Sequence, residues 1–570
     1  MKAAKAHYID YEFLPSRRDP LRKWVLALLV LAPFAYGALA LILGADASWD
    51  LRNYHWYNPY AYLTGRHDSG IDFLPAQSQF FLNPWLDVPF YLLATHLPLK
   101  LAYFILGTVQ GINFPLLFML AWMTLIIPKT LHKAGACAAI AALGTFSAMG
   151  ISEIGAVFYD NVTSIGILLS ALLVLRHLKY LAEAPEARAA ITAALCSLPA
   201  GLAVGLKMTC ASFCLAECFA LLVVTGVTRR GFVVAFAFGC GALLGYAITY
   251  GHWGWYLFTQ YGSPTFPFFN RVFHAPLMPA VSIGDYFVLG GSAKLLHPFM
   301  IAIDPYMANE IWWQDWRIPI LYVFLIFAAA RTISLSFFGS KKTEERVAAP
   351  LPTRFLLWMG AASYFTWISF EAVYRYLLPL DMLAPLLIVI CAGLMPFTLR
   401  TRWQTAASAL IVIAVTIQPG TWGRHHVWPE KMSGISAPAL PRGTDTLVLM
   451  AGYDAYAYLL PEFPPEVAFL RIQSRTFRPE EKLGINDVIA GKIEAHKGPL
   501  KLFMTARDLK TAEAALARFH LALLPKTCTQ VQDRLYESHL DRPKEFNNAY
   551  PPAYSLCDVR RLPPPGKPKR

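Results

Sequence analysis

The chain has 570 residues, of which 56% are hydrophobic and only 15% are charged, and its mean hydropathy is +0.41. This composition excludes an ordinary soluble globular protein and requires a bilayer to solvate much of the chain. The formal net charge of +13 comes from short basic clusters between apolar runs, which argues against the continuous basic face of a nucleic-acid-binding protein. We therefore expect membrane lipids, and no nucleic acid, among its partners.

The chain begins with a basic segment, residues 1–23, in front of a first apolar run at 24–44. This run is too long and too poorly flanked for a cleaved signal peptide, so it predicts a retained transmembrane helix. A helix needs about 20 apolar residues to cross the hydrocarbon core. Further runs of this kind lie at 101–127, 135–151, 162–179, 189–206, 210–228, 232–250, 318–338, 353–370, 377–396 and 403–420. The sequence therefore predicts a polytopic α-helical membrane protein of about eleven transmembrane helices over residues 24–420.

The basic residues favour one orientation of these helices. If residues 1–23 are cytoplasmic, every short basic cluster falls in a cytoplasmic loop, as the positive-inside rule requires. An odd number of crossings then places residues 421–570 on the outer side. The loops predicted on that side, 45–100 and 251–317, are long and rich in Trp and Tyr, which are typical of membrane interfaces.

Residues 421–570 have the pattern of a water-exposed domain. Short β-like runs alternate there with a helical pattern near 509–519, which predicts a small α/β domain. The β-like runs are 446–450, 467–470 and 500–504. The Pro-rich end, 563–568, predicts no regular structure.

Cys528 and Cys557 are the cysteines of this outer part. An oxidising compartment favours a disulfide between them, which predicts a staple across a polar, Pro-containing segment. The alternative is a pair of buried free thiols.

Two short outer segments contain carboxylates at the edge of the hydrocarbon. Asp50 follows the first apolar run directly, where it could act in catalysis or cap the helix that begins near Leu51. His55 lies in the aromatic segment beside it and is a candidate for contact with substrate. Glu153 and Asp160 share one short outer turn, and ionisable groups at this depth usually face a cavity, a partner charge or a substrate.

Two cations lie on the same outer side. Lys207 ends one apolar run there, against the basic-inside pattern, so it needs either a phosphate or an ion pair with an outer acid. Arg375 lies between Tyr374 and Tyr376, an arrangement suited to bidentate recognition of phosphate or carboxylate with aromatic packing. The alternative for Arg375 is snorkelling to lipid headgroups.

These segments, in this order, resemble the membrane-embedded glycosyltransferases of the GT-C superfamily, which include protein O-mannosyltransferases and the aminoarabinose transferase of lipid A. Asp50 is similar to the first-loop acid of that family, and Asp160 is similar to its second-loop acid. Three short motifs add to the resemblance: NPWL at 83–86, GLK at 205–207 and YRYLLP at 374–379. The chain departs from the family by having Trp85 where a second Pro is usual, and a single acid at Asp50.

The resemblance implies transfer of a sugar from a polyprenyl-phosphate donor to a glycan, lipid or protein acceptor, on the periplasmic side of a bacterial inner membrane. It implies direct displacement with inversion, with Asp50 as the general base and Asp160 as a second acid that orients the acceptor or a metal. Lys207 and Arg375 would then stabilise the departing phosphate. A divalent cation held by Asp50 and Asp160 is compatible with this chemistry but is not required by it.

Two other classes of function remain open at this point. A transporter or lipid flippase would also contain charges in its membrane part, but transporters usually show internal repeats and binding groups near the bilayer midplane. This sequence shows no repeat, and its charges lie at one face. A noncatalytic scaffold for envelope polysaccharide assembly would fit the aromatic outer loops.

Overall fold

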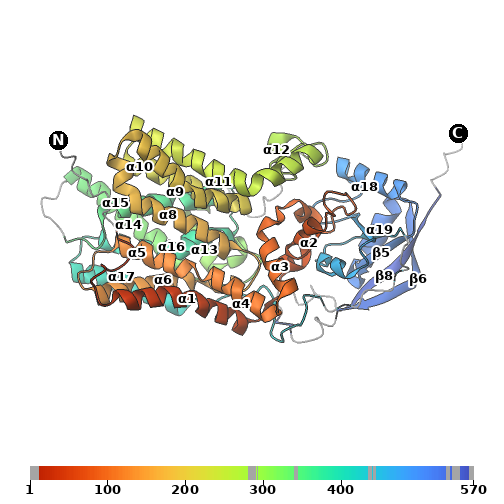
Figure 1. Ribbon diagram of the computed structural model, residues 1–570, viewed down its shortest axis with the longest axis horizontal. Coiled ribbons are helices and arrows are strands. Elements are labelled where there is room, and N and C mark those ends of the chain that lie inside the picture. Colours follow the sequence, from red (N-terminus) through yellow and green to blue (C-terminus); the bar gives the residue numbers. More distant parts are fainter. Residues whose placement is uncertain are drawn as a thin grey trace.

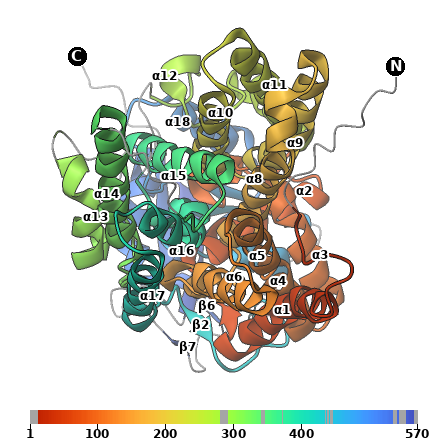
Figure 2. The ribbon, with the colours of Figure 1, turned by 90° about the vertical axis from the view of Figure 1, so that its left-hand side faces the viewer.

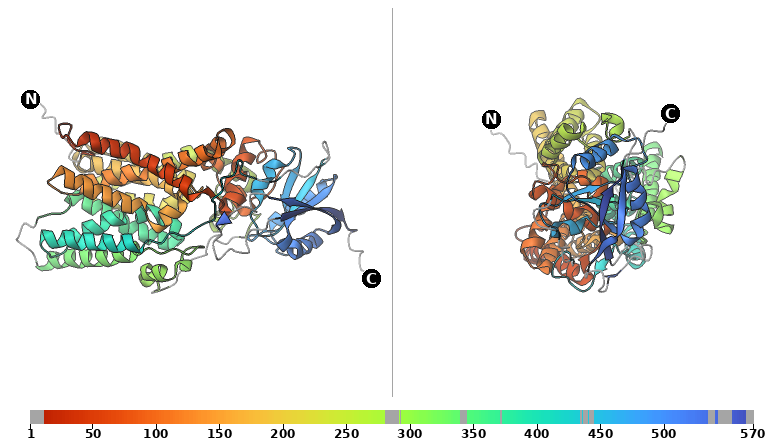
Figure 3. Two further views of the ribbon diagram at one scale, coloured as in Figure 1. Left: turned by 90° about the horizontal axis from the view of Figure 1, so that it is seen from below. Right: turned by 90° about the vertical axis from the view of Figure 1, so that its right-hand side faces the viewer.

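The computed structural model describes residues 12–279, 291, 293–338, 345–370, 372–433, 435, 440, 445–533, 540–541 and 553–563. The chain folds into a long helical bundle with a small α/β domain at one end (Figure 1). The start of the first helix and the C-terminal domain lie at opposite ends of the bundle, as Figure 3 also shows.

The long helices of the bundle are α1 (Arg22–Leu43), α4 (Leu99–Gln110), α5 (Asn113–Thr124), α6 (Thr130–Thr145), α8 (Asp160–Glu183), α9 (Glu186–Leu206), α10 (Ala211–Thr225), α11 (Arg229–Tyr261), α14 (Arg317–Phe338), α15 (Pro350–Phe370), α16 (Leu378–Gly393) and α17 (Leu399–Thr416). Shorter elements are α7 (Ala148–Glu153), α12 (Asn270–Phe273), α13 (Ala293–Ile303) and the turn η7 (Tyr374–Leu377). The end view in Figure 2 shows α16 inside the bundle. Every residue from Leu378 to Ala392 is buried, and all of them except Asp381 are apolar.

Eight segments in the described part of the chain are long and apolar enough to cross a membrane. They are Arg22–Leu43, Leu99–Thr124, Asp160–Glu183, Glu186–Leu206, Met208–Thr225, Arg229–Tyr261, Arg317–Ser334 and Tyr374–Gly393. The prediction of a multi-pass helical membrane protein is confirmed, whereas the count of eleven is not. Three predicted runs form helices outside this set: α6 has only 16 residues, and α15 and α17 contain arginines near their starts.

A layer of short elements lies between the bundle and the C-terminal domain, where α2 and α3 are seen in Figure 1. It consists of β1 (Ala45–Asp46), η1 (Leu51–His55), α2 (Tyr57–Leu63), η2 (Gln77–Phe81), η3 (Pro84–Leu86) and α3 (Val88–His96). Strand β1 pairs with β2 (Arg424–His425), which pairs with β7 (Leu540–Asp541), so the exit of α1 is tied to the chain that follows α17. Buried apolar residues of this layer and of the C-terminal domain form one continuous core.

The C-terminal domain contains a five-stranded sheet of order β4-β3-β5-β8-β6. The strands are β3 (Leu447–Met450), β4 (Ala468–Arg471), β5 (Leu500–Thr505), β6 (Leu521–Gln532) and β8 (Ala553–Arg561), and the other elements are η8 (Ala457–Glu462), α18 (Gly484–Ala495), η9 (Ala506–Asp508) and α19 (Leu509–Arg518). Strands β4, β3 and β5 are parallel, whereas β8 joins β5 and β6 in antiparallel pairs. The small sheet is the α/β arrangement that the alternating pattern predicts. The end of the Pro-rich segment, 564–568, lies outside the described residues.

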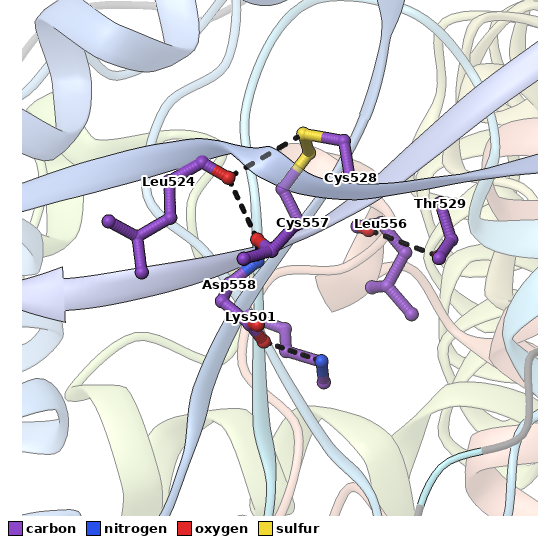
Figure 4. The surroundings of a disulfide bond; sticks show 8 residues. Lys501, Leu524, Cys528, Thr529, Leu556, Cys557 and Asp558 are labelled. Atoms are coloured by element: carbon purple, nitrogen blue, oxygen red, sulfur yellow. Dashed lines mark hydrogen bonds and ion pairs between the residues drawn. A yellow bond between two sulfur atoms is a disulfide. The ribbon is translucent and has the colours of Figure 1, made fainter.

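Cys528 and Cys557 form a disulfide between the neighbouring strands β6 and β8, with their Cα atoms 4.0 Å apart (Figure 4). Cys557 is fully buried, and Cys528 lies where the register of the two strands shifts between Leu524 and Thr529. The disulfide therefore closes the long connection between β6 and β8.

We expect the double variant Cys528→Ser, Cys557→Ser to destabilise the β6–β8 pair by about 3–4 kcal/mol, because the two cysteines are 29 residues apart and their bond restricts the unfolded chain. Hydrogen exchange of the amides in these two strands measures the effect. Cys240→Ser, at an exposed free cysteine, is the control and should leave the exchange unchanged. Alkylation of both tail cysteines in denatured, unreduced protein would contradict the bond.

Candidate functional site

Four charged residues meet where helices of the bundle end on the side of the C-terminal domain. Asp50 follows α1 and precedes η1, and Asp160 is the first residue of α8. Lys207 directly follows α9, and Arg375 lies in η7, in front of α16. Residues from four distant parts of the chain therefore share one end of the bundle.

The four charges form two ion pairs. Arg375 Nη1 lies 3.0 Å from Asp50 Oδ2, and Lys207 Nζ lies 2.6 Å from Asp160 Oδ1. Their side chains keep between 4% and 19% of their exposure, so the pairs are mostly screened from water. The ion pair with an outer acid, one of the two partners expected for Lys207, is thus present, and the guanidinium of Arg375 faces a carboxylate.

The carboxylate of Asp50 is not used to cap a helix. The backbone amide of Leu51 donates to Ser48 Oγ at 3.2 Å, whereas within the described ranges Asp50 makes no side-chain capping bond. Asp50 Oδ2 instead accepts hydrogen bonds from the Tyr54 hydroxyl and from Arg375, each at 3.0 Å. The capping contact that the sequence allows for Asp50 is therefore not formed, and its carboxylate faces Arg375 instead.

Tyr376 links the two ion pairs. Its ring centre lies 5.2 Å from both Lys207 Nζ and Arg375 Cζ, and its hydroxyl accepts a hydrogen bond from Arg375 at 3.3 Å. Phe158 and Trp422 also lie against the guanidinium of Arg375, at 4.8 and 5.6 Å from the ring centres. The two cations therefore share one aromatic wall.

Tyr374 does not belong to this wall, although the sequence pairs it with Tyr376. Its hydroxyl donates to Asp381 Oδ1 at 2.7 Å, and its ring centre lies 4.0 Å from that of Trp313. Successive residues of the η7 turn point in different directions, so only one of the two tyrosines reaches Arg375.

Glu153 ends α7 beside the two ion pairs and is 1% exposed. Neither of its carboxylate oxygens has a hydrogen-bond partner among the described residues. Burial, followed by the charge of Asp160, raises the pKa of Glu153 well above its ordinary value, while Lys207 and Arg375 act in the opposite direction. Glu153 is therefore a buried acid beside the two ion pairs, and its burial favours the protonated form.

We expect Glu153→Gln to make the folded protein more stable at pH 8 than the wild type, with a smaller difference at pH 5. The folded state binds a proton at Glu153 that the unfolded state releases above about pH 4.5, so the stability of the wild type falls as pH rises through this range. Thermal unfolding in detergent at the two pH values measures the difference. A Gln variant with the same pH dependence as the wild type would show that Glu153 is ionised.

His55 and Asp87 form a second polar unit in the same place. His55 Nδ1 lies 2.6 Å from Asp87 Oδ1, and the imidazole ring lies between Tyr54 and Tyr159, with ring centres 4.0 and 5.3 Å away. Burial, then the charges of Lys207 and Arg375, lowers the pKa of His55 well below its ordinary value. Burial raises the pKa of Asp87.

Asp46 connects the segment after α1 with the turn before α8. Its Oδ2 accepts the backbone amide of Val157 at 2.9 Å, and its Oδ1 accepts that of Ser48 at 2.8 Å, so the exit of α1 is held against the turn before α8. Within that turn, Tyr159 has a left-handed backbone (φ 63°) and directly precedes Asp160. Strain of this kind persists where the surrounding structure enforces it, often at functional sites.

The sequence reasoning missed Asp46 and two further groups of charged residues. One is Asp87, the partner of His55. The other is a fully buried cluster in which Arg317 Nε lies 2.9 Å from Asp315 and 3.6 Å from Asp381. A signal was present, because ionisable residues at the start of an apolar run are expensive and need partners.

The residues present do not fit a divalent cation on Asp50 and Asp160, which the sequence left open. Each carboxylate already faces its own cation, and the described residues contain no group of three or more His, Cys, Asp or Glu that could hold a metal ion. We derive no step through a metal.

Comparison with known proteins does not place this chain. No family model matches it, and no curated protein sequence matches it either.

Proposed function

We propose that this chain is a membrane glycosyltransferase of the GT-C type, which transfers a sugar from a polyprenyl-phosphate donor to the hydroxyl of a glycan, lipid or protein acceptor. The observation that carries the proposal is the contact of two carboxylates with two cations around Tyr376 at one end of the bundle. Such a transfer needs a base for the acceptor hydroxyl and positive charge for the departing phosphate.

The ion pairs suit an exchange of partners. A lipid phosphate that binds Lys207 and Arg375 competes with Asp160 and Asp50 for the same donors. Because both cations lie on one aromatic wall, one phosphate can approach both of them. The carboxylates released in this way would face the acceptor, and the family resemblance gives the acceptor proton to Asp50.

We place the reaction at the outer face of a bacterial inner membrane, with the C-terminal domain in the periplasm. The basic segment 1–23 supports a cytoplasmic N-terminus. The Cys528–Cys557 disulfide supports an oxidising compartment for the other end.

The assay mixes purified protein with membrane lipid extract and measures release of polyprenyl phosphate together with sugar incorporation into the acceptor fraction. A transferase releases the lipid phosphate in proportion to the sugar transferred. A flippase or a scaffold would release none, and that result would overturn the proposal.

We expect Lys207→Ala to lower kcat/KM for the donor by about 10- to 100-fold, because a charge-assisted hydrogen bond contributes about 1.5–3 kcal/mol. The acceptor KM should change little. Lys501→Ala is a matched control, since Lys501 also lies 2.6 Å from a carboxylate, that of Asp558, but in the C-terminal domain. Equal losses for donor and acceptor would contradict a role at the phosphate.

A further inference from the structure

We propose that His55 accepts the proton of the acceptor hydroxyl and that Asp87 positions it for this task. The inference rests on the transferase function proposed above. It gives the role of base to a histidine–carboxylate dyad and leaves Asp50 to hold Arg375 and the acceptor.

The geometry of the dyad is that of an oriented base. Asp87 holds His55 through Nδ1 at 2.6 Å, which leaves Nε2 as the nitrogen available for chemistry. This Nε2 atom is buried and has no hydrogen-bond partner in the part of the chain that the structure describes. A carboxylate that fixes one nitrogen of a buried imidazole, with the other nitrogen facing a substrate, is the arrangement that activates many nucleophiles.

Asp50 is already engaged by two donors. Its Oδ2 accepts hydrogen bonds from both Arg375 and Tyr54. Tyr54 also packs against the imidazole of His55, so a hydroxyl that reaches Asp50 lies close to the dyad.

The charges around the dyad couple its basicity to the donor. The groups that face His55 come from several elements: Tyr54 from η1, Asp87 before α3, Tyr159 before α8, Lys207 after α9 and Arg375 from η7. Burial lowers the pKa of the imidazole most, and the two cations lower it further. A donor phosphate bound to these cations offsets their charge. Donor binding therefore raises the proton affinity of His55 before the acceptor hydroxyl loses its proton.

The acceptor oxygen forms a bond to the anomeric carbon of the sugar, and the bond between that carbon and the phosphate oxygen breaks. The electron pair of the broken bond leaves with the polyprenyl phosphate. The proton of the acceptor hydroxyl passes to His55 Nε2, the dyad binds it as a unit, and solvent takes it after the product leaves.

The test compares His55→Gln and Asp87→Asn with the wild type in the polyprenyl phosphate release assay. We expect kcat to fall by about 10²- to 10⁴-fold in His55→Gln, the usual contribution of a general base, with the donor KM unchanged. The matched control is His67→Gln, because His67 is likewise a buried histidine packed on aromatic rings, those of Phe80 and Trp253. His67→Gln should keep kcat within threefold of the wild type.

The pH profile separates a positioning role of Asp87 from a structural one. With the donor saturating, kcat of the wild type should fall at low pH as the dyad becomes protonated, and Asp87→Asn should move this acid limb without changing the donor KM. If His55→Gln fails to fold, the displaced limb of Asp87→Asn carries the test. The dyad alone would be overturned if the wild type is active and kcat of His55→Gln is within threefold of the wild-type value. It would also be overturned if Asp87→Asn leaves the acid limb of the pH profile where it is in the wild type. A wild type that releases no polyprenyl phosphate would overturn the transferase itself.

Discussion

Asp50→Asn should lower kcat for sugar transfer by at least about 10²-fold while leaving the protein folded. Asparagine keeps the shape of the side chain and can still accept from Tyr54, but it cannot balance the charge of Arg375. The guanidinium then lies unneutralised against its aromatic wall before the donor arrives, and the acceptor loses its carboxylate contact. Steady-state release of polyprenyl phosphate, with thermal unfolding in detergent as the check on folding, measures the effect.

The matched control is Asp454→Asn, which removes another carboxylate paired with an arginine, Arg507 at 2.9 Å, on the surface of the C-terminal domain. It should leave kcat unchanged. If the His55–Asp87 dyad is the base, the residual kcat of Asp50→Asn should fall at low pH over the same range as kcat of the wild type. A near-normal turnover number would remove Asp50 from the site.

The long helices were predictable because hydrocarbon imposes a length and a composition on them. The run 24–44 corresponds to Arg22–Leu43, and the run 162–179 lies within Asp160–Glu183. Where packing inside the protein replaces contact with lipid, this rule loses force. The run 135–151 forms the end of the 16-residue helix α6 and the start of the short helix α7, which Ser147 caps by accepting the backbone amide of Gly150.

The C-terminal sheet was only partly predictable. The apolar run 446–450 becomes β3, where all of Leu447–Met450 is buried. In contrast, β6 contains Pro525, Lys526 and Thr527 and is largely exposed along its middle, so its sequence lacks a strand pattern. Pairing with β8, across the disulfide, is what holds this segment extended.

In the candidate site, the sequence predicted that the charged residues lie at one end of the helices, but it did not predict which acid pairs with which cation. The positive-inside rule is enough to place Asp50, Asp160, Lys207 and Arg375 on one face. Which acid meets which cation depends on the order of helices around the bundle, to which the sequence pattern gives no access. Asp87 was not predicted for the same reason, since it faces His55 only because of the path of the nonhelical chain around it.

Arg317→Met should reduce the free energy of unfolding by about 3–5 kcal/mol, the largest stability effect we expect for a single substitution in this chain. Arg317 is fully buried between Asp315 and Asp381, and it also donates to the carbonyl oxygens of Leu143 and Asp381 at 3.0 and 3.1 Å. Methionine fills much of the same volume, so the loss comes from two buried carboxylates without their cation. Unfolding of the purified protein in mixed detergent and SDS measures it.

Arg354→Met is the control, because Arg354 lies exposed on α15 and donates to one backbone carbonyl, that of Val223, at 3.3 Å. It should change the unfolding free energy by less than about 0.5 kcal/mol. Adding Asp381→Asn to Arg317→Met should restore part of the loss, since one unneutralised charge disappears. If Arg317→Met is as stable as Arg354→Met, the three charges do not hold α14 against α16. The Tyr374–Asp381 hydrogen bond would then have to position the η7 turn, and Arg375 within it, without their help.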